Sequence, residues 1–176
     1  MGQHPLSQLR RYDAGAIAQY YRYRPWKALS RTLHVIFSFL GFFLGLKWDE
    51  WQGNQERHKL KRAEQLRNTL IRLGPTFIKV GQALSTRPDL IRKDFLDELI
   101  KLQDQLPPFP TPIALALIEA ELARPVNEIF SQISPLPVAA ASLGQVYHAR
   151  LYTGEEVAVK VQRPNLLPVI TLDLYL

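Results

Sequence analysis

The hydrophobic pattern of this chain changes from helical to strand-like spacing near residue 135. Up to that point, apolar residues recur at intervals of three and four, and prolines punctuate the pattern, which predicts a series of amphipathic helices. These helices are expected over 55–73, from Pro75, from Asp94 as a cap, from Thr111 to about Leu122, and as a short turn within 127–133. Two strand-like runs follow at 145–151 and 155–162, joined by a turn at Thr153-Gly154. The pattern therefore predicts an α+β chain in which a long helical extension precedes a β-hairpin.

An apolar run over residues 33–46 precedes all of these helices. As a helix its fourteen residues would span about 21 Å, which is short of the roughly 30 Å hydrocarbon core of a bilayer. Lengthening the helix toward Ala28 would add the charge of Arg31, so a complete transmembrane span is the weaker interpretation. Two interpretations stay open: a hydrophobic helix docked on the rest of the protein, or a segment that dips into or lies on a membrane surface.

Positive charge gathers on both sides of the apolar run and contributes to a net charge of +6. Basic clusters of this kind suit anionic lipid headgroups, nucleic acid or plain solvation. Their position beside an apolar run favours lipid, so no nucleic-acid partner is expected. The pattern lacks the order of a secretory signal, and the absence of cysteine excludes disulfides and fits a reducing interior. We expect an intracellular protein that associates with a membrane.

The strand-like part carries a pattern typical of nucleotide binding. A kinase-type loop reads G-x-G-x-x-G-x-V and leads, one hairpin later, to V-A-I-K. In that register Ala139 and Ala141 stand at the first two glycine positions, Gly144 at the third, and Lys160 ends a V-A-V-K string. Small residues let the backbone approach phosphates, and the lysine supplies a positive charge to them. The candidate nucleotide-binding residues are Ala139, Ala140, Ala141, Ser142, Gly144, Val146 and Lys160.

Alanine in place of glycine is a departure from the kinase pattern. It removes easy access to positive φ, so the loop is expected to fold differently over the phosphates. An alanine-rich turn and a V-A-V-K strand can each arise by chance, but both in register are much less expected.

A second string, K-V-G-Q, lies on the helix that begins at Pro75. Lys79 and Gln82 are three residues apart and share a helix face, and Gly81 between them permits close packing. Arg87 and Asp89 follow in the turn after the helix. From spacing alone, the favoured interpretation is an ordinary amphipathic helix whose glycine packs against a neighbour.

Four strings in this order resemble the signature of the UbiB/ADCK (aarF-domain) family of atypical protein-kinase-like proteins. They are K-x-G-Q, S-x-R-x-D, L-Q-D-x-x-P-P and A-A-A-S-x-G-Q-V, at Lys79–Gln82, Ser85–Asp89, Leu102–Pro108 and Ala139–Val146. The resemblance runs from about Gln55 to the end of the chain. The sequence of residues 87–109, together with the basic Y-R-Y-R-P-W string near the N-terminus, is most similar to the cyanobacterial and plastid branch of the family.

The resemblance implies a protein-kinase-like small lobe whose helical extension folds over the active site. Lys79 and Gln82 would then reach toward the nucleotide and restrain it. The implied regulatory residues are Lys79, Gly81, Gln82, Ser85, Arg87 and Asp89. The family implies ATP with Mg²⁺ as cofactor and an ATPase or a small-molecule or lipid kinase activity. It also implies isoprenoid-quinone or prenyl-lipid metabolism, with membrane lipid or quinone intermediates as partners, at the cytoplasmic or the thylakoid or plastid side of a membrane.

The chain contains neither an H-R-D nor a D-F-G string, and only sixteen residues follow Lys160. A kinase site also needs a catalytic aspartate and metal-binding residues. We therefore expect no catalytic or metal-binding residue in this chain, which would be the truncated N-terminal portion of an ATP-binding protein. The alternative is a free-standing, non-catalytic helical module that binds a membrane or a partner. The expected domains are a basic and apolar segment over 1–54, a helical K-x-G-Q extension over 55–134, and the start of the small lobe over 135–176.

Overall fold

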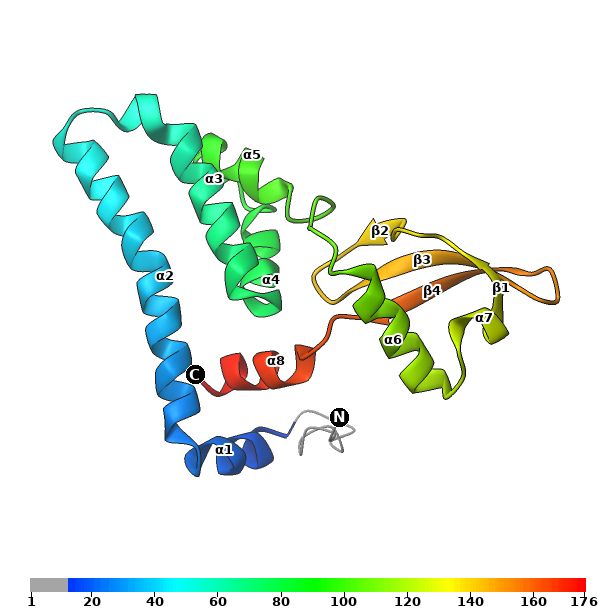
Figure 1. Ribbon diagram of the computed structural model, residues 1–176. Helices are drawn as coiled ribbons and strands as arrows, with labels where there is room; N and C mark the ends of the chain where they lie inside the picture. The colour runs from blue at the N-terminus through cyan, green and yellow to red at the C-terminus, as the bar shows by residue number, and fades with distance from the viewer. Residues whose placement is uncertain (1–12) are drawn as a thin grey trace. The chain divides into compact units, whose positions relative to one another are not determined.

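The computed structural model describes residues 13–176, which pack as two units. The first unit is helical and runs as far as Leu102, and it also contains the last segment, Asn165–Leu176. The second unit, Gln103–Pro164, contains helices and a small sheet (Figure 1). The predicted α+β class is confirmed.

The helical unit is built around α3. Its described helices are α1 (Ala14–Arg22), α2 (Pro25–Trp51), α3 (Gln55–Leu73), α4 (Pro75–Leu84), α5 (Lys93–Ile100) and α8 (Leu166–Tyr175). Helix α3 packs against α2, α4 and α5, while α8 packs against α1, α2 and α4. Leu70, Leu73, Ile78, Leu99 and Leu102 are almost fully buried and form the centre of this unit.

Helix α3 has the bounds that its apolar spacing predicts. Ala63, Leu70 and Leu73 turn inward and are buried. Gly74 ends the helix with φ +101, a conformation that favours glycine, and Pro75 then opens α4 at its first position. The prediction for α5 is wrong at its start. The N-cap is Arg92 rather than Asp94, because Asp94 lies in the first turn and its carboxylate accepts hydrogen bonds from the Arg92 guanidinium.

Helix α2 is much longer than the apolar run suggests. It extends over 27 residues, because Pro25 starts it well before residue 33 and it continues to Trp51. By length and composition alone, it is the helix in the described part of the chain that could cross a membrane. Helices α1 and α8 were not predicted. Asp13 caps α1 through a hydrogen bond from the backbone N–H of Ala16.

The second unit pairs a four-stranded antiparallel sheet with a helix. Its described elements are α6 (Thr111–Leu122), α7 (Val126–Ile129), β1 (Phe130–Ile133), β2 (Ala139–Ala140), β3 (Gly144–Leu151) and β4 (Glu156–Gln162). Strand β4 pairs along nearly all of β3, so β1 and β2 pair with successive parts of the other edge of β3. The predicted hairpin is therefore present as β3 and β4, and two further strands extend it.

One face of this sheet is covered by α6. Ala114 and Ile118 of the helix form a core with Tyr147 and Ala149 of β3 and Val161 of β4. Since side chains alternate along a strand, the residues between them lie on the opposite face. That second face contains the residues that the sequence singles out.

Candidate functional site

The sheet register brings three predicted nucleotide-binding residues into one row. Val146 of β3 pairs with Ala139 of β2 on one side and with Lys160 of β4 on the other. Residues opposite each other in an antiparallel sheet point to the same face, with Cβ atoms about 5 Å apart. The row lies on the face away from α6, and Ala158 lies on this face one step along β4 from Lys160. The face thus combines small and apolar side chains with one lysine.

The turn between β2 and β3 is tight. The backbone N–H of Ala141 donates to the carbonyl oxygen of Gly144 at 2.7 Å, and Ser142 between them is buried. A Cβ atom on Gly144 would lie 2.4 Å from the carbonyl oxygen of Val161. Real side chains do not approach a backbone this closely, so this position requires glycine. The turn therefore lies directly against β4, the strand that contains Lys160.

Arg163, directly after β4, anchors this turn, a role that the sequence analysis missed. Its Nε donates to the carbonyl oxygen of Ala141 at 3.0 Å, and its Nη2 donates to that of Pro107 at 2.7 Å. Its backbone N–H donates to the carbonyl oxygen of Leu143. Partial burial lowers the pKa of the guanidinium by removing water from it. The only available hint was a basic residue three positions beyond the lysine.

Gln145 connects the sheet to the segment that leads into α6. Its side chain is 1% exposed and exchanges two hydrogen bonds with the backbone of Phe109, at 3.0 and 3.1 Å. Its Nε2 also donates to the Tyr147 hydroxyl, which in turn donates to Thr111. A buried amide with all these partners fixes β3 relative to the start of α6.

Lys160 is exposed, and within the described residues its ammonium makes no hydrogen bond or ion pair. The acidic side chain on the same strand face, Glu156, is already engaged by Arg150 and His148. The hydrogen bond from Arg150 is the main reason that the pKa of Glu156 is lowered. The charge of Lys160 is therefore available to an anion.

The K-x-G-Q string belongs to the helical unit and lies on α4. A Cβ atom on Gly81 would lie 2.4 Å from Cδ1 of Leu102 and 2.9 Å from Cδ1 of Leu70, so the helix packs closely there. The Gln82 amide donates to the carbonyl oxygen of Leu102 at 2.7 Å. Ser85 donates to the carbonyl oxygen of Gln82 at the end of the helix. Gly81 and Gln82 hold α4 against the end of α5, and the Ser85 bond closes the last turn of α4 itself.

The other predicted regulatory residues are on the surface. Lys79 is exposed on α4, and Arg87 and Asp89 form a two-bonded ion pair in the turn after it, at 3.0 and 2.8 Å. That pair lowers the pKa of the Asp89 carboxyl and raises the pKa of Arg87. The predicted contact of Lys79 and Gln82 with a nucleotide stays a prediction.

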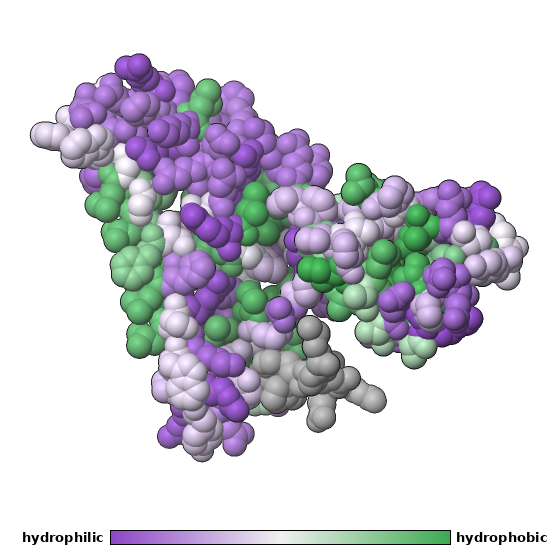
Figure 2. Space-filling model, in the orientation of Figure 1, coloured by the Kyte–Doolittle hydropathy of each residue, from purple (hydrophilic) through white to green (hydrophobic). Residues whose placement is uncertain are grey.

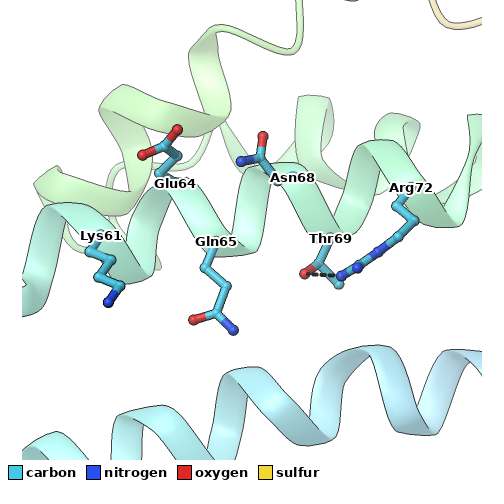
Figure 3. Close-up of a pocket in the computed structure, with 6 residues that line it drawn as sticks. All are labelled: Lys61, Glu64, Gln65, Asn68, Thr69 and Arg72. Atoms are coloured by element: carbon cyan, nitrogen blue, oxygen red, sulfur yellow. Dashed lines mark hydrogen bonds between the residues drawn. The ribbon is translucent and has the colours of Figure 1, made fainter.

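A shallow hollow of about 510 Å³ lies along α3 (Figure 3). Its lining residues, all from this one helix, are Lys61, Glu64, Gln65, Asn68, Thr69 and Arg72. Arg72 donates to the Thr69 hydroxyl, and the remaining groups are amides and single charges. No nucleophile stands beside a base among these six residues, so the hollow is a polar helix face. Within residues 13–176, no group of three His, Cys, Asp or Glu side chains is arranged to hold a metal ion.

Comparison with known proteins relates the chain to one protein family. Residues 101–176 match the ABC1 atypical kinase-like domain. An uncharacterised protein of Synechocystis sp. is 65% identical over 175 residues, which cover 99% of this chain and 31% of that protein. The chain belongs to the ABC1 atypical kinase-like family. This confirms the resemblance read from the four strings.

Plant members of the ABC1 family also align with nearly the whole chain. Protein ACTIVITY OF BC1 COMPLEX KINASE 3, chloroplastic, of Arabidopsis thaliana is 53% identical over 166 residues, or 94% of this chain and 23% of that protein. Protein ACTIVITY OF BC1 COMPLEX KINASE 1, chloroplastic, is 50% identical over 149 residues, or 84% of this chain and 22% of that protein. The chain thus spans about a quarter to a third of the length of these ABC1 relatives.

Proposed function

We propose that this chain supplies the nucleotide-binding strands of an ATP-dependent ABC1 protein, an ATPase or a small-molecule or lipid kinase, and is not catalytic alone. The observation that carries the proposal is the row formed by Ala139, Val146 and Lys160 across three strands. A lysine opposite a valine on one sheet face, beside a turn that contains small residues such as Ala141 and Ser142, is the arrangement that holds ATP in kinase-like small lobes.

The residues of this face fit the parts of ATP. Val146 and Ala158 offer an apolar surface of the kind that a base ring contacts, and Lys160 offers a cation with no other partner among the described residues. The fastened turn at Ala141 and Gly144 would hold its backbone close to the phosphates. When bound, Mg²⁺ neutralises the charge of the triphosphate.

We further propose that the helical unit restrains the nucleotide site through Lys79 and Gln82. Two observations support this role. Lys79 is exposed, and Gln82 binds the carbonyl oxygen of Leu102, directly before the chain passes into the sheet unit at Gln103. Loss of the hydrogen bond from Gln82 to Leu102 would release the start of the segment that connects the two units.

The substrate class and location follow from the family resemblance. We propose a role in isoprenoid-quinone or prenyl-lipid metabolism, with quinone or prenyl-lipid intermediates as partners. The names of two plant relatives describe chloroplastic proteins, which supports a plastid- or thylakoid-type membrane over other sites.

The test is the substitution Lys160→Ala in the natural protein that carries this chain. Loss of a charge-assisted contact to phosphate should weaken ATP binding by about tenfold or more, measured by calorimetric titration with Mg-ATP. The matched control is Lys61→Ala, an exposed lysine on α3, which should leave affinity unchanged. Equal affinity in the Lys160→Ala variant and the unaltered protein would refute the assignment of this lysine.

A second candidate function is a free-standing, non-catalytic helical module. The exposed apolar face of α2 favours it, since that face could bind a membrane or a partner without any nucleotide. The intact mass of the natural protein separates the two candidates: a mass of 20.2 kDa supports the module, and a much larger mass supports the enzyme.

A further inference from the structure

Helix α2 has its large apolar side chains on the outside. Its exposed residues recur every three or four positions from one end to the other, and together they form an outer apolar face. This outer apolar face consists of Trp26, Leu29, Leu33, Ile36, Phe37, Leu40, Phe43, Leu44, Trp48 and Trp51. Only 6% of the most apolar 18-residue stretch of the helix is buried. Figure 2 shows hydrophobic residues along the middle of this helix, at the left of the view.

The inner face of α2 is mixed, because the buried Phe42 lies on it together with charged residues. It holds the partly buried Arg31 near one end and the buried Asp49 near the other, about 27 Å apart along the helix. Arg31 donates to Asp173 at 2.7 Å and to the carbonyl oxygen of Leu73 at 2.6 Å. Asp49 accepts a hydrogen bond from Arg62 at 2.6 Å and bonds to His58 at 2.8 Å. Both ends of α2 are thereby attached to the rest of the helical unit.

We propose that the outer apolar face of α2 docks lengthwise on an anionic membrane surface, with the helix lying in the plane of the interface and not spanning the bilayer. This interaction surface goes beyond the proposed nucleotide-binding function and does not depend on it. A helix with an apolar stripe and aromatic ends is the kind that lies at the boundary between headgroups and acyl chains.

The attachments of α2 exclude the spanning arrangement. Helix α3 packs along α2 and consists largely of charged and amide residues, such as Arg57, Glu64 and Arg67. If α2 crossed the bilayer, α3 would have to enter the hydrocarbon, where each central charge costs about 3 kcal/mol or more. Otherwise α2 would have to separate from α3 and lose its contacts with Arg62 and His58. An in-plane helix keeps every one of these contacts.

The charges and aromatic residues along α2 fit an anionic surface. Lys27 is exposed at one end and Arg22 on the preceding helix, while Lys47 at the other end is exposed and pairs with Glu50 at 2.9 Å. Trp26 marks one end of the outer apolar face and Trp51 the other, and tryptophan side chains favour the headgroup level. Both ends of an in-plane helix lie at that level, so both tryptophans would be at their preferred depth.

The first test is vesicle flotation. The full chain would be produced by cell-free synthesis in the presence of preformed vesicles. One set of vesicles contains phosphatidylcholine alone, and the other contains about a third phosphatidylglycerol. We expect it to float with the anionic vesicles, with less binding at high salt. Phe37→Asp with Leu44→Asp should reduce the bound fraction about tenfold or more, because both residues belong to the outer apolar face. The matched control is Leu60→Asp with Leu122→Asp, two exposed leucines on α3 and α6, which should bind normally.

The second test distinguishes lying from spanning. The chain has no cysteine, so Ser30→Cys and Gln52→Cys each provide a single labelling site near one end of α2. An impermeant maleimide added outside sealed vesicles should label both variants to the same extent. Protection of one site by the bilayer would overturn the in-plane arrangement. Failure to float, or equal binding to neutral vesicles, would overturn the anionic surface as the partner.

Discussion

Gly144 lies where strands β3 and β4 approach too closely for a side chain. A Cβ atom there would be 2.4 Å from the carbonyl oxygen of Val161 and 3.3 Å from Cα of Gln162. Both neighbours belong to the backbone of β4, so neither can turn aside as the end of a flexible side chain can. Any substitution at Gly144 must therefore displace the strand that contains Lys160.

We predict that Gly144→Ala destabilises the sheet unit by about 1–3 kcal/mol and weakens nucleotide binding in the natural protein. Denaturant unfolding and Mg-ATP titration measure the two effects. Gly41→Ala is the control, since a Cβ atom there meets nothing within 4 Å and alanine is the better helix former. Unchanged stability of Gly144→Ala would mean that the two strands can separate locally at little cost.

The sequence predicted part of this site and missed the rest for a physical reason. Ala139, Val146 and Lys160 belong to a local pattern, and strand alternation alone puts Val146 and Lys160 on compatible faces. Arg163 and Gln145 act through partners far away in the chain. Arg163 reaches the carbonyl oxygen of Pro107, and Gln145 reaches the backbone of Phe109. Such contacts depend on the path of the chain in three dimensions, which spacing along the sequence does not describe.

At the scale of elements, sequence periodicity predicted helices better than it predicted their orientation. Helices α3 and α6 have the predicted ranges, because their apolar residues face a core. In α2 most of the large apolar residues face outward while Arg31 and Asp49 face inward, so the usual rule for the buried face fails. Helix α8 was missed because its short apolar sequence resembles a strand as much as a helix.

The α2–α3 hairpin contains a buried carboxylate that makes its stability dependent on pH. Hydrogen bonds lower the pKa of Asp49 to about 2, and the bond from Arg62 contributes more than the one from His58. Because this pKa is below the ordinary value of an aspartate, the folded chain binds the proton less tightly than the unfolded chain does. The stabilisation is therefore complete above about pH 4 and is lost as the pH falls toward 2.

We predict that Asp49→Asn removes this contribution at neutral pH and flattens the acid limb of the stability profile. Thermal unfolding followed by circular dichroism, at a series of pH values below 6, gives the comparison. The unaltered chain should lose melting temperature more steeply on acidification than the variant. Other carboxyls with lowered pKa, such as Glu56 and Glu156, contribute equally to both proteins and cancel in the difference. Parallel profiles would show that Asp49 does not control the acid response.

At the scale of the whole molecule, the two units divide the chain differently from the predicted boundary at residue 135. Helix α6 belongs to the sheet unit, and the chain returns to the helical unit at Asn165, directly after the strand that contains Lys160. Helical spacing cannot reveal which helix covers a sheet, so this division was not readable from the pattern. The last helix, α8, joins helices from the start of the chain.

An ion pair with little exposure connects these distant parts. Arg31 and Asp173 lie 142 positions apart in the sequence, and their side chains are 13% and 4% exposed. The guanidinium makes two hydrogen bonds to the carboxylate, at 2.7 and 3.0 Å, and one to the carbonyl oxygen of Leu73. Helix α8 has a second attachment, from the Tyr21 hydroxyl to Thr171 and to the carbonyl oxygen of Pro168.

We predict that Arg31→Ala destabilises the helical unit by about 3 kcal/mol, because it leaves the Asp173 carboxylate buried without its cation. Asp173→Ala should cost less, since Arg31 keeps the carbonyl oxygen of Leu73 as a partner. The double variant should be more stable than the sum of the two single losses implies, which unfolding measurements on all four proteins would reveal. The exposed pair Arg124 and Glu128 is the control and should show almost no coupling. Additive losses at Arg31 and Asp173 would mean that packing against α1, with the Tyr21 contacts, holds α8 without help from the ion pair.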